Sequence, residues 1–396
     1  MRYGIKLLAK AALALGLLFI LPVHVQAGPK INFGDESSLT INYAAQLYLQ
    51  NRDTGSGPEG DDDTTDIFFR RNRLMFVGQI SEKQGFYLAI QQQGDKRIFE
   101  TMVADSPVKE FDVLDAYYNA DLAPVFKVRA GLAKDQLVRE NNEGCFDPLS
   151  LDRSLFVYTP LTRLSRDYGV IAWGNLAKSK VQYRLAAMKG NDTGDDPKSS
   201  LRYTGRVHLT LLDPEDGLTY SGTYLGQKKV FTVGAGYQFE PDAVFGNVAA
   251  QTMASDYTAF TYDLFFEYPT SAGTFTASGA YLDVDFDDAY KGGDPDARST
   301  GLTGQKNGWY GKAGYLLPKK VGPGNLQFFG RYEKWEFANL NDVFDQEIKW
   351  IGAGLNYLVK GQNLRYTVEF ANTDFDKETD TVEDFNTITA MLQFRF

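Results

Sequence analysis

Basic side chains recur at alternate positions of several short segments, where they would all point to one side of an extended chain. Arg202 and Arg206, for example, alternate with Tyr203 and Val207. An arginine offers a planar fork of N–H donors that matches the oxygens of a carboxylate or phosphate group. The same alternation assigns nine basic residues to a polar face: Arg71, Arg73, Lys127, Arg129, Arg184, Arg202, Arg206, Arg331 and Arg365. This set predicts a surface that attracts and binds anions.

The acidic side chains of the same polar face are unevenly distributed. They are Asp115, Asp263, Glu267, Asp283, Asp285, Glu333 and Glu369. All but Asp115 lie in the C-terminal half of the chain, whereas most of the basic residues lie in the N-terminal half. A basic strip in a narrow aqueous pore would concentrate anions and steer them inward. The alternative is that each arginine pairs with a neighbouring carboxylate and only fills the wall.

Residues with catalytic or metal-binding chemistry are scarce. His208 is the only histidine that remains if residues 1-27 are removed, and Cys145 is the only cysteine. A lone cysteine excludes an intramolecular disulfide and a cysteine-based metal cluster, and Phe146 after it excludes a haem-attachment motif. The acidic run 61-63 could hold Ca²⁺, but no EF-hand pattern surrounds it, and such runs are usually solvated. We therefore predict no enzyme activity, no cofactor and no metal site.

Alternating apolar and polar residues run through the chain in sixteen short stretches. The last ends at the C-terminus with Phe394 and Phe396 on the apolar face. We expect strands near 39-50, 67-80, 86-94, 111-121, 125-134, 167-174, 180-190, 200-212, 229-239, 256-268, 274-286, 308-317, 325-337, 347-359, 364-375 and 384-396. Such stretches are typical of an all-β, 16-stranded antiparallel transmembrane β-barrel. An even count places both termini on the periplasmic side. The alternative is a soluble β-sandwich.

The first residues indicate export. Three basic residues precede the apolar run 11-21, and Val25-Gln26-Ala27 supplies the small residues of a cleavage site. The run is shorter than the ~20 residues of a membrane-spanning helix, so an uncleaved anchor is the weaker interpretation. We predict a cleaved signal peptide at 1-27 and one barrel domain at 28-396. Loss of Arg2, Lys6 and Lys10 would lower the formal net charge from −10 to −13, which argues against a nucleic-acid partner.

The connection from Asp135 to Arg166 is the longest, and it would be the third extracellular loop. It carries Arg139, Arg153, Arg163 and Arg166 together with several acidic and apolar residues. Loops beyond ~12 to 15 residues are usually functional or disordered. We therefore expect this loop to fold inward and constrict the pore, the alternative being a surface loop that caps the mouth or contacts another subunit. The connection from Asp213 to Lys228 is too long for a tight periplasmic turn, and the sequence gives no account of it.

Several motifs resemble the phosphate-selective porin O/P family. The stretch IFFRRNRLMFVG at 67-78 is similar to the Phe-Arg-Arg-X-Arg-Leu strand of that family. Further motifs similar to that family are LDAYYNA at 114-120, VRAGLAK at 128-134, LDRSLF at 151-156, RDYGVIAWG at 166-174 and VQYRLAAMKGND at 181-192. The resemblance implies a trimeric, sixteen-stranded outer-membrane channel with a constricting third loop and an arginine ladder. It carries Arg71 and Arg73 over to the family's strand-two arginines, and it also implies a matching role for the loop residues Arg153, Arg163 and Arg166. The chain lacks the grouped pore lysines of the phosphate-specific members.

We therefore expect a passive diffusion channel in a Gram-negative-type outer membrane. It would pass small hydrophilic solutes and prefer anions, either phosphate-like or carboxylate solutes. The expected partners are outer-membrane lipid or lipopolysaccharide, small anionic solutes and two further copies in a homotrimer. One alternative is a barrel sleeve in an electron-transfer complex with a periplasmic haem protein. The other is a barrel enzyme such as an outer-membrane lipase or protease, for which His208 would have to act as the base, held by a neighbouring residue.

Overall fold

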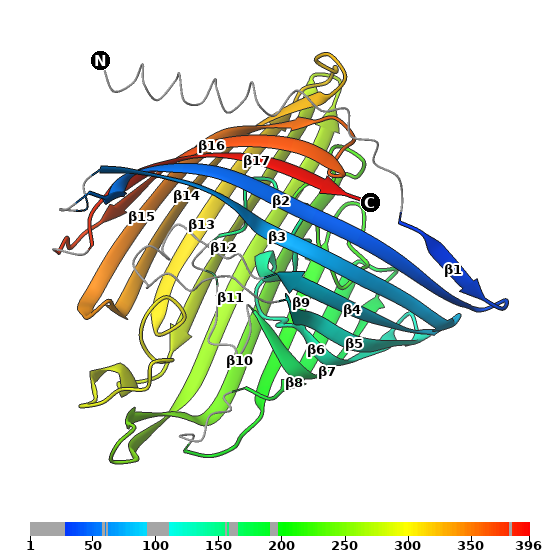
Figure 1. Ribbon diagram of the computed structural model, residues 1–396. Helices are drawn as coiled ribbons and strands as arrows, with labels where there is room; N and C mark the ends of the chain where they lie inside the picture. Colours follow the sequence, from blue (N-terminus) through cyan, green and yellow to red (C-terminus); the bar gives the residue numbers. More distant parts are fainter. Residues whose placement is uncertain are drawn as a thin grey trace.

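The chain folds into a closed antiparallel β-barrel (Figure 1). The computed structural model describes residues 28–57, 60, 62–92, 111–154, 157, 165–190, 197–379 and 382–396. The expected signal peptide at 1-27 and the loop residue Arg163 lie outside the described residues. Across the described ranges, no helix has the length and apolar character needed to cross a membrane.

Seventeen strands and two short 3₁₀ helices make up the described structure. They are β1 (Lys30–Phe33), β2 (Ser37–Ser56), β3 (Asp62–Ser81), β4 (Gln84–Gln92), β5 (Phe111–Ala123), β6 (Phe126–Lys134), η1 (Glu140–Asn142), β7 (Arg166–Leu176), β8 (Val181–Met188), β9 (Arg202–Thr210), β10 (Val230–Asn247), β11 (Thr252–Thr270), β12 (Gly273–Asp285), η2 (Ala289–Lys291), β13 (Lys306–Leu316), β14 (Asn325–Leu340), β15 (Val343–Leu358), β16 (Leu364–Phe375) and β17 (Phe385–Arg395).

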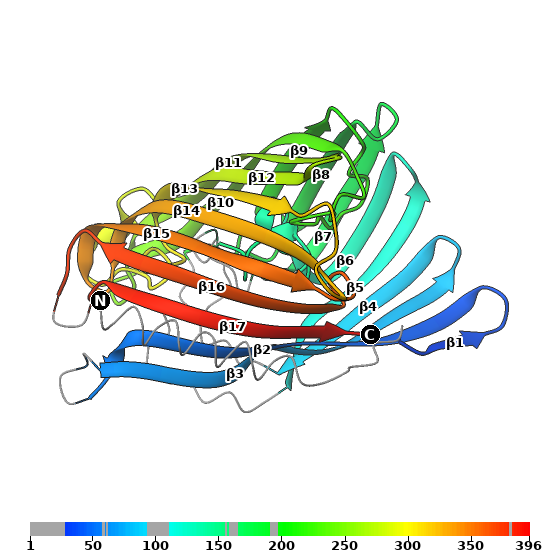
Figure 2. The same cartoon turned by 90° about the horizontal axis from the view of Figure 1, so that it is seen from above.

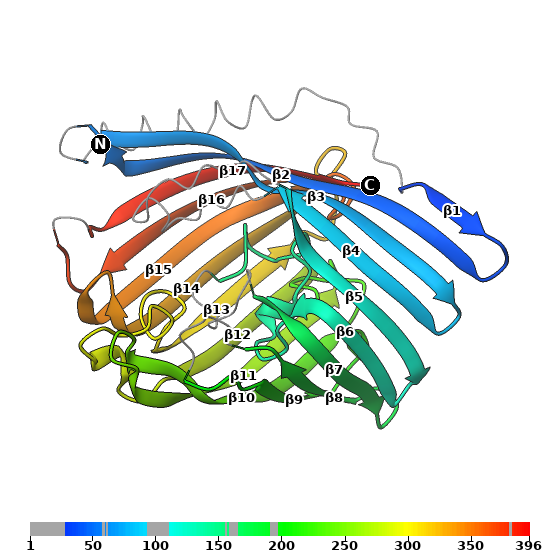
Figure 3. The same ribbon diagram turned by 60° about the horizontal axis from the view of Figure 1, so that its bottom comes forward.

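Strands β2 to β17 form the barrel, and each pairs with the next along the chain. The last strand closes the ring on the first, because β17 pairs with β2 from Thr387↔Arg52 to Arg395↔Ala44. Figure 2 shows this closure from above. The predicted 16-stranded barrel is therefore confirmed. The short strand β1, which the sequence pattern did not indicate, pairs with the start of β2 and extends beyond that end of the barrel (Figure 3).

Alternation of buried and exposed residues separates the two surfaces of the wall. In β9, Arg202, Arg206 and His208 are buried, whereas Tyr203 and Val207 between them are about half exposed on the outside. Successive side chains of a strand point to opposite faces, so a local period of two is enough to sort them. The outer face is apolar, as a barrel wall in lipid requires.

One region inside the barrel is apolar. Inward side chains of β10 to β17, among them Leu282, Trp335 and Trp350, pack together with Leu137 and Val138. On β12 the inward residues are consequently Leu282 and Val284, and Asp283 and Asp285 between them face outward. The prediction that these two acids line the lumen is wrong. The apolar side chains of β12 point inward because they pack in one cluster with Leu137 and Val138, which follow β6.

Candidate functional site

Residues 135–154, which we call the inner segment, leave β6 and contact the inner face of the opposite wall. Asn356 Nδ2 on β15 donates to the Leu149 carbonyl oxygen at 2.8 Å. Arg365 Nη1 on β16 donates to the Pro148 carbonyl at 2.8 Å, and Arg331 Nη1 on β14 donates to the Asp152 carbonyl at 3.0 Å. Inward-facing side chains thus satisfy the carbonyl groups of a segment without regular strand structure, as burial of such a backbone demands.

The connection between β9 and β10, residues 211–229, meets the inner segment from the other end of the barrel. We call it the inner connection. Tyr220 N donates to the Asn142 carbonyl at 3.0 Å, and Gly144 N donates to the Tyr220 carbonyl at 2.9 Å, as in a short parallel ladder. This contact explains the length of the connection, because a tight turn could not reach the barrel interior.

A buried ion pair fastens the same two segments. The Arg139 guanidinium donates from Nη1 and Nη2 to the two oxygens of Glu215, each at 2.8 Å. Both side chains are almost fully buried. Burial by itself would raise the pKa of the Glu215 carboxyl, but Arg139 and its hydrogen bonds lower that pKa to about 2. Arg139 also lies between the rings of Tyr220 and Phe265, 4.3 and 4.2 Å from their centroids.

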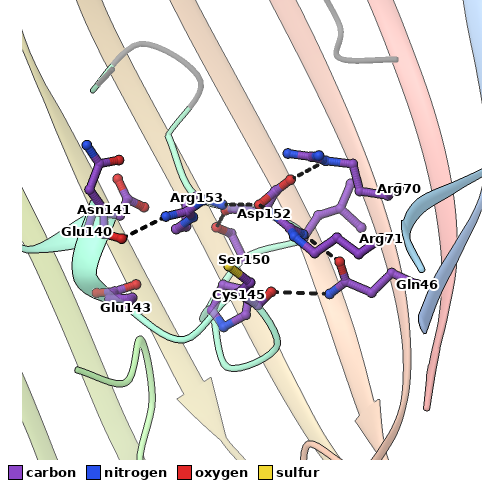
Figure 4. Close-up of polar contacts among 12 residues, drawn as sticks. Gln46, Arg70, Arg71, Glu140, Asn141, Glu143, Cys145, Ser150, Asp152 and Arg153 are labelled. Carbon is purple, nitrogen blue, oxygen red and sulfur yellow. Dashed lines mark hydrogen bonds and ion pairs between the residues drawn. The ribbon is translucent and has the colours of Figure 1, made fainter. Parts of the chain in front are cut away.

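Arg70 and Arg71 both point inward, which strict alternation does not allow. Gln46 of β2 pairs with Arg71 of β3, but the next residue, Leu47, pairs with Phe69. Arg70 is therefore the extra residue of a β-bulge in β3, and the bulge turns it inward. Arg70 Nε and Arg71 Nη2 then each donate to an oxygen of Asp152 at 2.7 Å (Figure 4). Burial opposes ionisation, but the two guanidinium groups hold the pKa of the Asp152 carboxyl well below its usual range. The sequence interpretation missed Arg70, and the only signal was the Arg-Arg pair that interrupts the period.

Further basic side chains gather around Cys145, and together with Arg70 they form what we call the cation cluster. Its members are Arg70, Arg71, Arg73, Lys134, Arg153 and Arg166. Burial would raise the pKa of the Cys145 thiol, but Lys134, Arg153 and their neighbours hold it well below its usual value. Two carboxylates belong to the cluster: Asp152, and Asp115, which Arg166 Nε contacts at 3.1 Å.

Other members of the predicted basic strip are paired with acids. Arg202 contacts Glu240 at 2.6 Å and Arg206 contacts Asp263 at 2.7 Å. Arg331 contacts Glu333 at 3.1 Å. For these residues the interpretation as wall-filling ion pairs fits the geometry, and the cationic strip expected along β9 is neutralised.

Two predicted arginines have uncharged partners. Arg184 donates to Gln136 at 3.0 Å and to Gln182 at 2.8 Å. Arg365 donates to carbonyl groups of the inner segment, at Pro148 and Ser150. Both guanidinium groups therefore anchor residues 135–154 or the wall next to them.

Lys127 and Arg129 lie closer to the short turn between β5 and β6, whereas Arg153 and Arg166 belong to the cation cluster. Lys127 and Arg129 on β6 are only partly buried and contact Asp121 and Asn119, each at 2.9 Å. Arg153 Nη1 donates to the Asn141 carbonyl at 2.9 Å. Arg166, expected in the loop, is the first residue of β7.

His208 is a buried side chain that packs inside the barrel. Its Nδ1 lies 2.7 Å from the Tyr220 hydroxyl, inside the barrel wall. Among the described residues, no group of three or more His, Cys, Asp or Glu side chains is arranged to hold a metal ion.

Comparisons with known proteins agree with this geometry. The sequence model of the family described as "Phosphate-selective porin O and P" matches residues 46–396. No curated protein matches the chain. Similar solved structures include an anion-selective porin from Comamonas acidovorans, with a TM-score of 0.58 and 11% identity over 91% of this chain and 100% of that one. Pseudomonas putida OprB has a TM-score of 0.60 and 9% identity over 91% and 94%. The in-vitro folded trimer form of Vibrio cholerae OmpT has a TM-score of 0.50 and 11% identity over 91% and 100%.

Proposed function

This chain belongs to the phosphate-selective porin O and P family and is an outer-membrane channel, and from that premise we propose that it passes small hydrophilic solutes with a preference for anions. The observation that carries the proposal is the cation cluster. Six basic side chains lie there with three acidic groups, the carboxylates of Asp115 and Asp152 and the Cys145 thiol, so basic groups outnumber acidic ones. The chain as a whole is acidic, with a formal net charge of −10, so the excess of basic groups is confined to this cluster.

The cation cluster can favour anions because the protein walls around it have a low dielectric constant. Fixed charges in a narrow passage with protein walls are weakly screened, so the local potential decides which ion enters. Guanidinium groups also offer paired donors to carboxylate and phosphate oxygens. The fit of the Comamonas acidovorans anion-selective porin supports the same fold, although its selectivity belongs to that protein. Phosphate-like and carboxylate solutes are the proposed anions.

The inner segment is the proposed constriction. It spans from β6 to inner side chains of β14, β15 and β16, and its residues are nearly all buried. It therefore occupies cross-section that a solute would otherwise use. A haem protein threaded through the barrel would have to displace this segment, which argues against the sleeve alternative.

Trimer formation is the proposed assembly state, supported by the trimer form of the similar Vibrio cholerae OmpT. Analytical ultracentrifugation of the detergent-extracted protein would test it. A monomer at all protein concentrations would contradict it, without affecting the proposal on ion preference.

The test of ion preference is the zero-current potential of the purified channel in a planar bilayer under a KCl gradient. An anion-preferring channel gives a potential whose sign corresponds to chloride moving faster than potassium. A potential of the opposite sign would refute the proposal. Potassium acetate and potassium phosphate gradients then rank the two proposed classes of anion.

A further inference from the structure

Aromatic rings and basic side chains form a continuous stack on the inner face of β4 to β7. The rings of Tyr87 on β4 and Tyr117 on β5 occupy paired positions, with centroids 5.2 Å apart and planes inclined by 23°. The Arg129 guanidinium on β6 lies 3.8 Å from the Tyr117 ring centroid. These three side chains are each only partly buried. Part of the stack is therefore open to the lumen.

The same face continues toward the short turn between β5 and β6. Lys127 Nζ lies 4.9 Å from the centroid of the Trp173 ring, and Trp173 occupies the position paired with it on β7. The Lys127 side chain is 20% exposed, the highest value among the basic residues predicted to line the pore for which an ion pair is measured. Trp173 itself is buried in an apolar cluster with Ile171 and Leu218, so we call only Tyr87, Tyr117, Lys127 and Arg129 the aromatic track.

The aromatic track leads to the cation cluster. Asp115, two residues before Tyr117 on β5, is the carboxylate that Arg166 contacts. Gln91, four residues after Tyr87 on β4, accepts hydrogen bonds from Arg73 at 2.6 and 3.1 Å. A solute that enters from the end with the tight turns would therefore meet the rings of the track first and the cluster next.

This arrangement distinguishes between anions by shape. A planar organic anion can lay its ring against the tyrosine stack while its carboxylate faces Arg129, which donates to the uncharged Asn119, whereas Lys127 is already paired with Asp121. Inorganic phosphate has no apolar face and gains nothing from the rings. We propose that the aromatic track is a binding site for aromatic carboxylates, and that the channel takes these in preference to inorganic phosphate. The inference rests on the proposed anion preference and names the class of anion.

The experiment compares three blockers of the chloride current through single channels in a planar bilayer: benzoate, cyclohexanecarboxylate and inorganic phosphate. Benzoate and cyclohexanecarboxylate carry the same charge and are close in size, but only benzoate has an aromatic ring. We expect benzoate to reach half-block at about fivefold lower concentration than cyclohexanecarboxylate, and phosphate to be weaker than benzoate. Blockers added to the side with the tight turns should act faster.

Matched variants locate the effect. Tyr87→Leu should abolish the difference between benzoate and cyclohexanecarboxylate. Tyr118→Leu removes a ring from the outer face of β5, where Tyr118 is 38% exposed, and should leave the difference unchanged. Tyr87→Phe keeps the ring and should behave like the parent protein, so it serves if the leucine variant fails to fold.

Equal block by the two carboxylates, or strongest block by phosphate, would refute the proposal that the aromatic track binds aromatic carboxylates. The zero-current potential in KCl is measured on the same channels. If it still indicates anion preference, only the track is refuted, whereas a cation-side potential refutes the proposed function itself.

Discussion

Arg139 and Glu215 join two segments that enter the barrel from opposite ends, through a pair of parallel hydrogen bonds of 2.8 Å. Arg139 lies in the inner segment and Glu215 in the inner connection. Without the inner segment, the buried Glu215 carboxylate would lose this ion pair, whereas Arg139 also lies 3.8 Å from Glu143 of its own segment. The pair thus makes the position of each segment depend on the other.

Removing one member of this pair should be costly. Arg139→Gln leaves the Glu215 carboxylate buried without its counter-ion, and we expect a loss of about 3 to 5 kcal/mol in the free energy of unfolding. Denaturant unfolding of the barrel in detergent measures it. Lys291→Gln, which breaks the exposed pair with Asp288, is the control and should leave the midpoint unchanged. The double variant Arg139→Met with Glu215→Met should lose less than Arg139→Gln, and an equal or larger loss would contradict the role of the pair.

Neutralising a basic residue should change the ion preference of the channel most if that residue belongs to the cation cluster. Arg73 donates to the uncharged Gln91, so Arg73→Gln removes a positive charge without leaving a carboxylate behind. We expect the anion-to-cation permeability ratio to fall by about twofold. Arg202 lies outside the cation cluster and pairs with Glu240 at 2.6 Å, so Arg202→Gln should lower stability while changing the ratio less than Arg73→Gln does. Zero-current potentials distinguish the two variants, and a larger shift in Arg202→Gln would contradict the assignment.

Ion preference should decrease as pH rises through neutrality. Burial, and then the neighbouring Glu140, raise the pKa of the Glu143 carboxyl to about 7. This group is neutral below that pH and negative above it, so a rise from about pH 6 to about pH 8 adds negative charge next to the cation cluster. The zero-current potential should therefore shift toward cation permeability over this range. Glu143→Gln should flatten the profile, and an unchanged slope in that variant would assign the titration to another group.

The charge of a thiol reagent should control its reaction with Cys145. The surrounding basic side chains favour the thiolate and attract anions, so the anionic sulfonatoethyl methanethiosulfonate should react about tenfold faster than its cationic trimethylammonioethyl analogue. Mass spectrometry follows both reactions. The control is Thr379→Cys in a Cys145→Ser background, because Thr379 is exposed and stands between Glu378 and Asp380 in the sequence, so a cysteine there should prefer the cationic reagent. The same preference at both positions would contradict a cationic environment around Cys145.

The amino-acid sequence by itself determined the barrel and most of its inner and outer surfaces. A strand exposes alternate residues to lipid and lumen, so the pattern of Arg202, Tyr203 and Arg206 already contains the assignment of each side chain. The number of strands follows from the same local period. None of these properties requires knowledge of what a strand faces across the lumen.

Only the tertiary structure decided how the basic residues are used. The register shift that turns Arg70 inward depends on the pairing of β3 with β2, and the inward course of the inner connection depends on contacts with Asn142 and Gly144. The outward position of Asp283 likewise follows from apolar residues that pack inside the barrel. An ion pair such as Arg139 with Glu215 joins residues far apart in the chain. Sequence periodicity fixes the side of the wall on which a charge lies, but its neutralisation is set by three-dimensional distance, because electrostatic energy depends on separation in space.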